Sequence, residues 1–285
     1  MPARFCVLAS GSAGNCALLQ SNGFGLLIDI GLGPRLLTAR LADVGATWRD
    51  VNAVLLTHSH RDHWKDLTLA QLHRLQIPLY CSPDHHASMT RYDGAFEPFV
   101  ETGLVRELSD GEALEVSAGI TVRPIAVPHD CAPTYGFRID GPAGLFGPQW
   151  SLGYAADLGE CRPELLEAFA DVNVLALEFN HCEQMERASS RPRFLIQRVL
   201  SELGHLSNRQ AADAVRAIAR ASANGSIRHL IQLHLSRDCN RVSLAAEAGR
   251  AALAEVGSQA TVITAEQYAA SRIVALDGDF RRVPA

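Results

Sequence analysis

The feature that constrains this chain most is a cluster of metal-binding residue types that directly follows a short apolar segment. Residues 53–63 read Ala-Val-Leu-Leu-Thr-His-Ser-His-Arg-Asp-His, and the first four predict a buried strand. Side chains at positions i and i+2 of an extended segment point the same way, so His58 and His60 can hold one metal ion together. Asp62 and His63 lie beyond the bend and can turn toward a second ion. A solvated loop with coincidental histidines rarely shows four such residues at this spacing, so we expect a metal centre at the end of a strand.

The remaining pattern predicts an α/β fold in two halves. Short β-rich segments separated by turn residues fill the first third of the chain, which is typical of antiparallel strands, and after Trp150 the pattern becomes strand, helix, strand, helix. We therefore expect an αββα sandwich of two mixed sheets with helices on both outer faces. No linker separates the halves, so we expect one domain over residues 1–285, with a long turn at 141–148. The expected strands are 5–9, 16–20, 25–30, 53–56, 78–81, 105–108, 113–116, 120–127, 135–139 and 228–233, and the expected helices are 34–44, 67–75 and one that opens at the capping box Ser207-x-x-Gln210.

Composition and charge argue against several classes of protein. The seven cysteines are scattered singly, with no Cys-x-x-Cys pair, which argues against a disulfide scaffold and a zinc ribbon. No run of eighteen apolar residues and no secretory signal pattern occur, so we expect a cytoplasmic protein that does not bind membranes. The net charge of −5 provides no global positive field. Any recognition of a nucleic acid must therefore be local.

The cluster, together with Asp29-Ile30-Gly31 after another apolar segment, resembles the metallo-β-lactamase superfamily. In that superfamily one apolar strand ends in Asp-x-Gly and a second ends in Thr-His-x-His-x-Asp-His. The resemblance implies two divalent cations, Zn²⁺ or Mn²⁺. It also implies three further ligands, each a single residue after a strand that would be a weak signal without the resemblance. Asp29 would then be a carboxylate that holds a ligand imidazole, or a simple turn residue. The implied ligand set is His58, His60 and His129 on one ion, Asp62, His63 and His234 on the other, and Asp157 between them.

Within the superfamily the chain resembles the bacterial YycJ/WalJ-type proteins, which are DNA exonucleases. This resemblance implies hydrolysis of a phosphodiester by a hydroxide between the two metals, with Asp62 orienting the hydroxide. One departure is that the family usually has Asp-Thr-Gly around the bridging aspartate, whereas this chain has Asp157-Leu158-Gly159. The ligand is kept, but its hydrogen-bonding neighbour changes. The segments that carry the resemblance are residues 8–15, 58–63, 177–181, 204–208 and 234–236.

His205 stands just before the capped helix and is the candidate acid of the reaction. It resembles the histidine with which related tRNA 3′-end-processing nucleases protonate the leaving oxygen, and Glu178 would be its partner. A structural hydrogen bond at the start of the helix is an equal alternative for His205. His181 remains unassigned. The turn at residues 10–15 could offer backbone N–H groups to a phosphate, although a plain hairpin turn explains it more simply.

An arginine-rich stretch precedes the His205 segment, with no acid between Glu186 and Glu202. A solvated helix face is the ordinary explanation of such a run. If the substrate is a nucleic acid, and we expect DNA, this stretch is the local strip that would bind backbone phosphates. The arginines are Arg187, Arg191, Arg193 and Arg198.

Two other functions stay open at the level of sequence. The same ligand set serves hydrolysis of thioesters or lactones elsewhere in the superfamily, and a fold with a metal site does not choose between substrates. The third hypothesis is a non-catalytic scaffold that keeps the fold, binds no metal and serves as a binding module. The sequence leaves the native metal, the polarity of cleavage and the oligomeric state undetermined.

Overall fold

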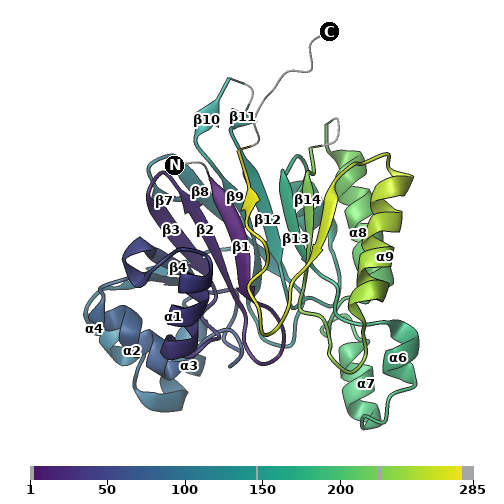
Figure 1. The fold of residues 1–285 in the computed structure, drawn as a ribbon. Helices are drawn as coiled ribbons and strands as arrows, with labels where there is room; N and C mark the ends of the chain where they lie inside the picture. Colours follow the sequence, from purple (N-terminus) through teal and green to yellow (C-terminus); the bar gives the residue numbers. More distant parts are fainter. Residues whose placement is uncertain (1–2, 146, 224–225, 278–285) are drawn as a thin grey trace.

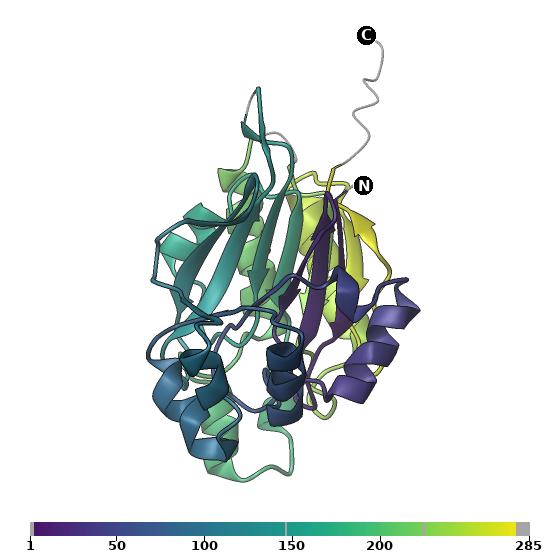
Figure 2. The ribbon, with the colours of Figure 1, turned by 90° about the vertical axis from the view of Figure 1, so that its left-hand side faces the viewer.

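Two seven-stranded sheets pack face to face, and helices cover the outer face of each (Figures 1 and 2). The computed structural model describes residues 3–145, 147–223 and 226–277. The predicted αββα sandwich is confirmed. Among these described residues no helix has the length and apolar character needed to cross a membrane.

The first sheet contains the N-terminal strands and has the order β16-β1-β2-β3-β4-β5-β6. Strands β1 to β3 are antiparallel, whereas β3 to β6 are parallel. Parallel neighbours need crossover connections, and helices provide them here. The strands are β1 (Arg4–Ala9), β2 (Cys16–Ser21), β3 (Phe24–Ile28), β4 (Ala53–Leu55), β5 (Leu79–Cys81), β6 (Val105–Glu107) and β16 (Val274–Ala275).

The second sheet has the order β15-β14-β13-β12-β9-β8-β7. Strands β7, β8, β9 and β12 are antiparallel neighbours, and β12 to β15 are parallel. The strands are β7 (Leu114–Ser117), β8 (Ile120–Val127), β9 (Thr134–Asp140), β12 (Ser151–Ala155), β13 (Val174–Glu178), β14 (His229–Leu233) and β15 (Thr261–Thr264).

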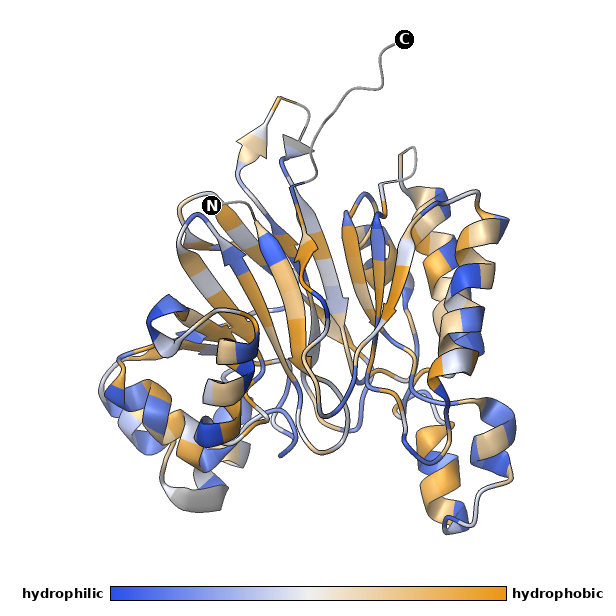
Figure 3. Ribbon diagram, viewed as in Figure 1, coloured by the Kyte–Doolittle hydropathy of each residue, from blue (hydrophilic) through white to orange (hydrophobic). Residues whose placement is uncertain are grey.

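Three apolar clusters hold the layers together, and Figure 3 shows the apolar strands of both sheets between helices with mixed surfaces. Residues such as Leu19 and Phe137 fill the space between the sheets, while the alternate residues of the strands face the helices, as the two-residue period of a strand requires. The helices beside the first sheet are α1 (Pro34–Asp43), α2 (Asp66–Arg74), α3 (His85–Asp93) and α4 (Glu97–Glu101). The remaining helices are α5 (Pro163–Ala168), α6 (Glu183–Arg187), α7 (Arg193–Val199), α8 (Asn208–Ala221) and α9 (Val242–Glu255), with one 3₁₀ turn at Trp48–Asp50.

Several segments differ from the sequence-based expectation, and most elements after Trp150 were predicted only as an alternation of strand and helix without bounds. Helices α3 and α4 were not predicted, because among the described side chains each buries a single apolar residue, Met89 in α3 and Phe99 in α4, which gives no apolar period. Residues 141–148, expected as a long turn, form a small hairpin in which β10 (Ala143–Gly144) pairs with β11 (Gly147–Pro148).

The predicted capping box at the start of α8 is confirmed, and it leads to a stability prediction. The Ser207 hydroxyl accepts a hydrogen bond from the Gln210 backbone N–H at 3.2 Å, and the Gln210 side chain accepts one from the Ser207 N–H at 2.9 Å. Replacing Ser207 with alanine should lower the free energy of unfolding by about 0.5–2 kcal/mol, because a helix N–H loses its acceptor. Urea denaturation would measure this change. The exposed Ser243→Ala substitution in α9 is the control, and equal losses in the two variants would contradict a capping role.

Candidate metal centre

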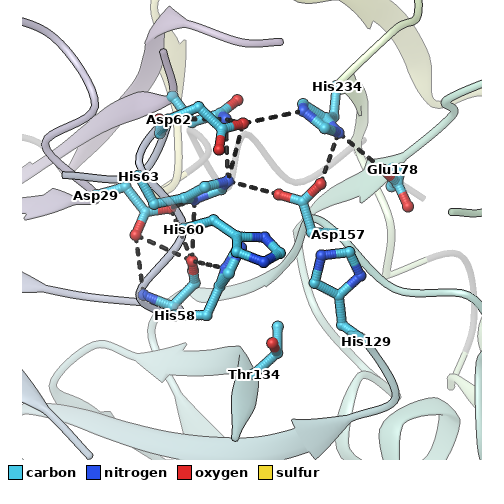
Figure 4. Close-up of polar contacts among 12 residues, drawn as sticks. Asp29, His58, His60, Asp62, His63, His129, Thr134, Asp157, Glu178 and His234 are labelled. Carbon is cyan, nitrogen blue, oxygen red and sulfur yellow. Dashed lines mark hydrogen bonds and ion pairs between the residues drawn. The ribbon is translucent and has the colours of Figure 1, made fainter. Parts of the chain in front are cut away.

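Three residues of the site adopt left-handed backbone conformations where strands end. Asp29 follows β3 with φ 63°, Asp157 follows β12 closely with φ 58°, and His234 follows β14 with φ 53°. Such conformations cost a non-glycine residue about 1–3 kcal/mol and are concentrated at functional sites. The loops that carry these residues all leave the carboxyl ends of parallel strands, so they meet at one edge of the sandwich, and Figure 4 shows the three side chains in one close-up.

His58, His60 and His129 form the first group of candidate ligands. The distances between their ring centroids are 4.7, 5.2 and 5.1 Å, and one ring nitrogen of each lies within 4.8 Å of the others. His58 and His60 follow the first sheet's β4, whereas His129 follows β8 of the second sheet. Burial lowers the pKa of all three imidazoles below the usual value. They are therefore neutral at neutral pH and keep the lone pair that a metal ion requires.

Asp157 is the centre of the second group and lies between His63 and His234 in Figure 4. Its Oδ2 is 2.6 Å from His63 Nε2, and its Oδ1 is 2.7 Å from His234 Nδ1. Asp62 Oδ2 lies 3.6 Å from Nε2 of both histidines. A ring nitrogen of His58 is also within 4.8 Å of the His63–Asp157 pair. Asp157 is thus near His58 of the first group as well as near His63 and His234.

The charges and hydrogen bonds of these side chains fit divalent cations. Nε2 of His58 and Nε2 of His234 are buried, and neither has a hydrogen-bond partner in the part of the chain that the structure describes. Burial alone would raise the pKa of Asp157, but the imidazoles of His234 and His63 lower it well below its usual value, so this buried carboxylate stays ionised. A buried anion requires a positive partner. Imidazole nitrogens together with carboxylate oxygens are donors that both Zn²⁺ and Mn²⁺ accept.

Asp29 fixes the orientation of His63. The Nδ1–H of His63 donates to Asp29 Oδ2 at 2.7 Å, and both side chains are fully buried. Thr57 also donates to Asp29, through its backbone N–H at 2.9 Å and its hydroxyl at 3.0 Å. This arrangement leaves Nε2 of His63 directed at Asp157. The Asp-x-Gly pattern has a steric cause as well, since a Cβ at Gly31 would lie 1.8 Å from the carbonyl oxygen of Asp62.

Replacing Asp29 with asparagine should therefore weaken metal binding by about 10–100-fold. The asparagine keeps the shape of the side chain but loses the charge that holds the Nδ1–H of His63. Competition against a chromogenic chelator would measure the affinity. Asp43→Asn at the exposed end of α1 is the matched control, and the hypothesis fails if both variants bind metal as tightly as the wild type.

Other residues that orient the ligands escaped sequence reasoning. His129 Nδ1 donates to the carbonyl oxygen of Gly204 at 3.0 Å, and the Asn180 side chain donates to the carbonyl oxygen of His234 at 2.7 Å. The Asn15 amide nitrogen lies 3.0 Å from His63 Nε2 and 3.3 Å from Asp62 Oδ2. In the sequence, only the small-residue turn at 10–15 drew attention to Asn15. The turn contacts the candidate ligands through the side chains of Ser10 and Asn15.

His205 lies beside the second group and contacts Glu178. Its Nδ1 is 2.9 Å from Glu178 Oε1 and 3.3 Å from Asp157 Oδ1. The buried Glu178 also accepts the backbone N–H groups of Leu158 and Leu206 at 3.1 and 3.0 Å. Burial would lower the pKa of His205, but the carboxylates of Glu178 and Asp157 together outweigh it and raise the pKa to about 9. The imidazole is therefore protonated at neutral pH before any cation is bound. The backbone N–H of Leu158 is a donor that any residue at this position would supply, so the contact with Glu178 does not depend on this chain's departure from Asp-Thr-Gly.

His181 is not in either ligand group. Its ring is fully buried, and neither ring nitrogen has a hydrogen-bond partner among the described residues. Its backbone oxygen accepts the N–H of Asn208 at 2.8 Å. The residue thus contacts the start of α8 through its backbone.

Two of the four arginines in the stretch expected to bind phosphates, Arg191 and Arg198, form ion pairs. Arg191 pairs with Glu186 at 3.1 Å and with Asp238 at 3.0 Å, and Arg198 pairs with Asp130. Asp238 and Asp130 are far from these arginines in the sequence, so the sequence did not indicate the two ion pairs, which form only in the folded chain. Asp130 also lies 3.2 Å from His129 Nε2, so Arg198 stands at the rim of the first ligand group. Arg187 and Arg193 line a groove of about 360 Å³ together with Ile196 and Gln197.

Comparison with known proteins adds an independent line of observation. The family model described as "Beta-lactamase superfamily domain" matches residues 26–227. The chain is 26% identical to the exodeoxyribonuclease WalJ of Streptococcus pneumoniae over 233 residues, which cover 80% of this chain and 81% of the relative. It is 28% identical to the exodeoxyribonuclease YycJ of Bacillus anthracis over 252 residues, which cover 86% of this chain and 87% of the relative.

A solved structure shares the architecture. The metallo-β-lactamase fold protein YhfI from Bacillus subtilis superimposes with a TM-score of 0.67 at 15% identity, and the match covers 96% of this chain and 99% of the other. At this identity the likeness concerns the fold alone. It agrees with the two-sheet arrangement described above.

Proposed function

This chain belongs to the β-lactamase superfamily, and on that premise we propose that it is a two-metal phosphodiesterase that degrades DNA from an end. The observation that carries the proposal is the position of Asp157, within 2.7 Å of both His63 and His234 and 3.3 Å from Nδ1 of His205. Relatives that are exodeoxyribonucleases and match over four-fifths of this chain support the choice of DNA. We also keep the proposal of one domain, because the apolar cluster between the sheets draws on strands from both halves.

The metal ligands in this proposal are the residues of the two groups. His58, His60 and His129 would hold one divalent cation, Asp62, His63 and His234 would hold the other, and Asp157 would contact both. When bound, the two cations supply Lewis acidity, which acidifies water and stabilises negative charge on the phosphate. Zn²⁺ and Mn²⁺ are the candidates.

The chain's own residues would orient the water and move the proton. Asp62, with a carboxylate that is partly exposed at the mouth of the site, would direct the attacking water toward phosphorus. As the water oxygen bonds to phosphorus and releases a proton to solvent, the P–O3′ bond would break, and His205 would donate its proton to the departing 3′ oxygen and regain one from solvent. Glu178 holds the imidazolium of His205 in place and favours its charged form. Burial would raise the pKa of Glu178, but His205 and His234 lower it to about 2. The carboxylate is therefore ionised at neutral pH.

End-labelled substrates test the proposal. Protein loaded with Zn²⁺ or Mn²⁺ should shorten 5′- or 3′-labelled DNA progressively, and prior removal of the metals with a chelator should abolish this activity. Labelled RNA of the same sequence, a thioester and a lactone form the comparison set. A metal-loaded protein that leaves DNA and RNA intact but hydrolyses the thioester or lactone would overturn the nuclease assignment. A protein that binds no divalent metal at all would favour a scaffold.

A further inference from the structure

A groove of about 530 Å³ is lined by residues that follow His234 in the chain and by Ser10. The Ser10 hydroxyl accepts a hydrogen bond from the His234 backbone N–H at 2.8 Å, so the lining of the groove directly contacts a candidate metal ligand. Ser236, Arg237, Arg241, Gln267 and Tyr268 also line it.

The far wall of the groove is tied to the turn that supports the ligands. The Glu266 carbonyl oxygen accepts a hydrogen bond from the Ser10 N–H at 3.0 Å. The Gln267 side chain accepts one from the Ala13 N–H at 2.8 Å and donates one to the Gly14 carbonyl oxygen at 3.0 Å. A Cβ at Gly11 would lie 2.5 Å from Gln267 Oε1, so this close approach requires glycine. In Figure 1 the segment between β15 and β16 that carries these residues returns along β1. The groove wall and the metal ligands therefore share one rigid support.

The groove carries the side chains that a single strand of nucleic acid requires. Arg237 and Arg241 are exposed, and neither forms an ion pair with any residue that the structure describes. Arg237 donates to the Tyr268 hydroxyl at 2.7 Å, and its guanidinium carbon is 5.9 Å from the ring centroid. The Tyr268 side chain is 62% exposed, so a face of the ring is open to solvent. Glu266 is the one acid among the lining residues, against two arginines.

We propose that this groove binds the nucleotides next to the scissile phosphate of single-stranded DNA, with Arg237 and Arg241 on backbone phosphates and Tyr268 stacked on a base. The inference rests on the proposed function and names the path of its substrate. Arginine pairs with phosphate oxygens through several N–H groups, and aromatic rings stack on any base without a sequence preference. A strand that crosses the metal centre needs contacts on both sides of it. The opposite rim carries Arg198, which Asp130 already holds.

Binding of single-stranded DNA with phosphorothioate linkages, which resist cleavage, tests the groove in the metal-loaded protein. Fluorescence anisotropy over a range of salt concentrations gives the Kd and its salt dependence. Arg237→Ala/Arg241→Ala should raise Kd about 10–100-fold and reduce the slope of log K against log salt by about 1.4, as expected for two lost phosphate contacts. Tyr268→Ala should raise Kd about 10-fold, whereas Tyr268→Phe should bind like the wild type, because the ring is retained.

A matched pair of arginines provides the control. Arg220 and Arg250 lie on the exposed sides of α8 and α9, and Arg220 is about 18 Å along α8 from its first residue. Arg220→Ala/Arg250→Ala removes the same charge and should leave Kd, salt slope and cleavage unchanged. Bound metal measured in every variant shows that the centre is intact.

The outcomes separate this inference from the proposed function. A wild-type protein that binds and cuts DNA, with an Arg237→Ala/Arg241→Ala variant of equal Kd and slope, overturns the groove and leaves the nuclease standing. A Tyr268→Ala variant that binds like the wild type overturns the stacking contact. A wild-type protein that neither binds nor cuts DNA overturns the proposed function, and the groove assignment falls with it.

Discussion

Replacing Asp157 with alanine is expected to lower phosphodiester hydrolysis by about 10³-fold or more and to reduce the metal content of the protein. Asp157 is the one carboxylate within 2.7 Å of both His63 and His234 among the described residues. In the proposed site its loss would remove a ligand common to both cations and leave Asp62 as the remaining acid of the second group, and about 4 kcal/mol of lost charge stabilisation corresponds to a 10³-fold slower reaction. Steady-state kinetics together with elemental analysis by mass spectrometry would measure both effects.

Asp157→Asn tests whether charge or shape matters at this position. The amide keeps the volume of the carboxylate, so a variant that folds but binds less metal assigns the loss to charge. Asp213→Ala on the exposed face of α8 is the control and should behave like the wild type. Two metal ions and full activity in Asp157→Ala would show that this residue is not a shared ligand.

Replacing His205 with alanine is expected to lower kcat on DNA by about 10²–10⁴-fold while the metal content stays unchanged. The reason is that the imidazole supplies the proton to the 3′ oxygen but belongs to neither ligand group in the proposal. A substrate with a p-nitrophenolate leaving group needs no such proton, so it should lose far less. His229→Ala, at the opposite end of the strand that leads to His234, is the control. Equal losses on both substrates would contradict proton donation.

The pH dependence of kcat provides a second signature of His205. The carboxylates of Glu178 and Asp157 together outweigh burial and raise the pKa of His205 to about 9, so the acid is charged below this pH and is lost as the pH rises through it. Bound cations repel the imidazolium and should move the fall in kcat to a lower pH. Glu178→Gln should move it lower still, and His205→Ala should remove this dependence. The bound metal must also be measured in the Glu178→Gln variant, because Glu178 Oε1 lies 3.0 Å from Nδ1 of His234, a candidate ligand.

Much of the architecture could be predicted because it follows from short-range regularities. Alternation along residues 120–127 predicts β8, and the box of Ser207 and Gln210 predicts the start of α8. The spacing within residues 58–63 indicates a metal centre by itself, since i and i+2 share a face of any extended segment. No spacing pattern indicated the other three candidate ligands, His129, Asp157 and His234. Each is a single polar residue after a strand, and only the resemblance to a superfamily pointed to it.

The sequence by itself determined strands β1 to β9 and β14, helices α1 and α2, the start of α8 and the residue types available to a metal ion, because those depend on neighbours a few positions apart. Only the tertiary structure decided which side chains meet. It placed Asn15 against His63, Asp130 against Arg198, and Gln267 against the turn at residues 10–15. These partners are 48, 68 and 254 positions apart. No local periodicity encodes such contacts, because they arise when two sheets pack and bring the carboxyl ends of their strands to one edge.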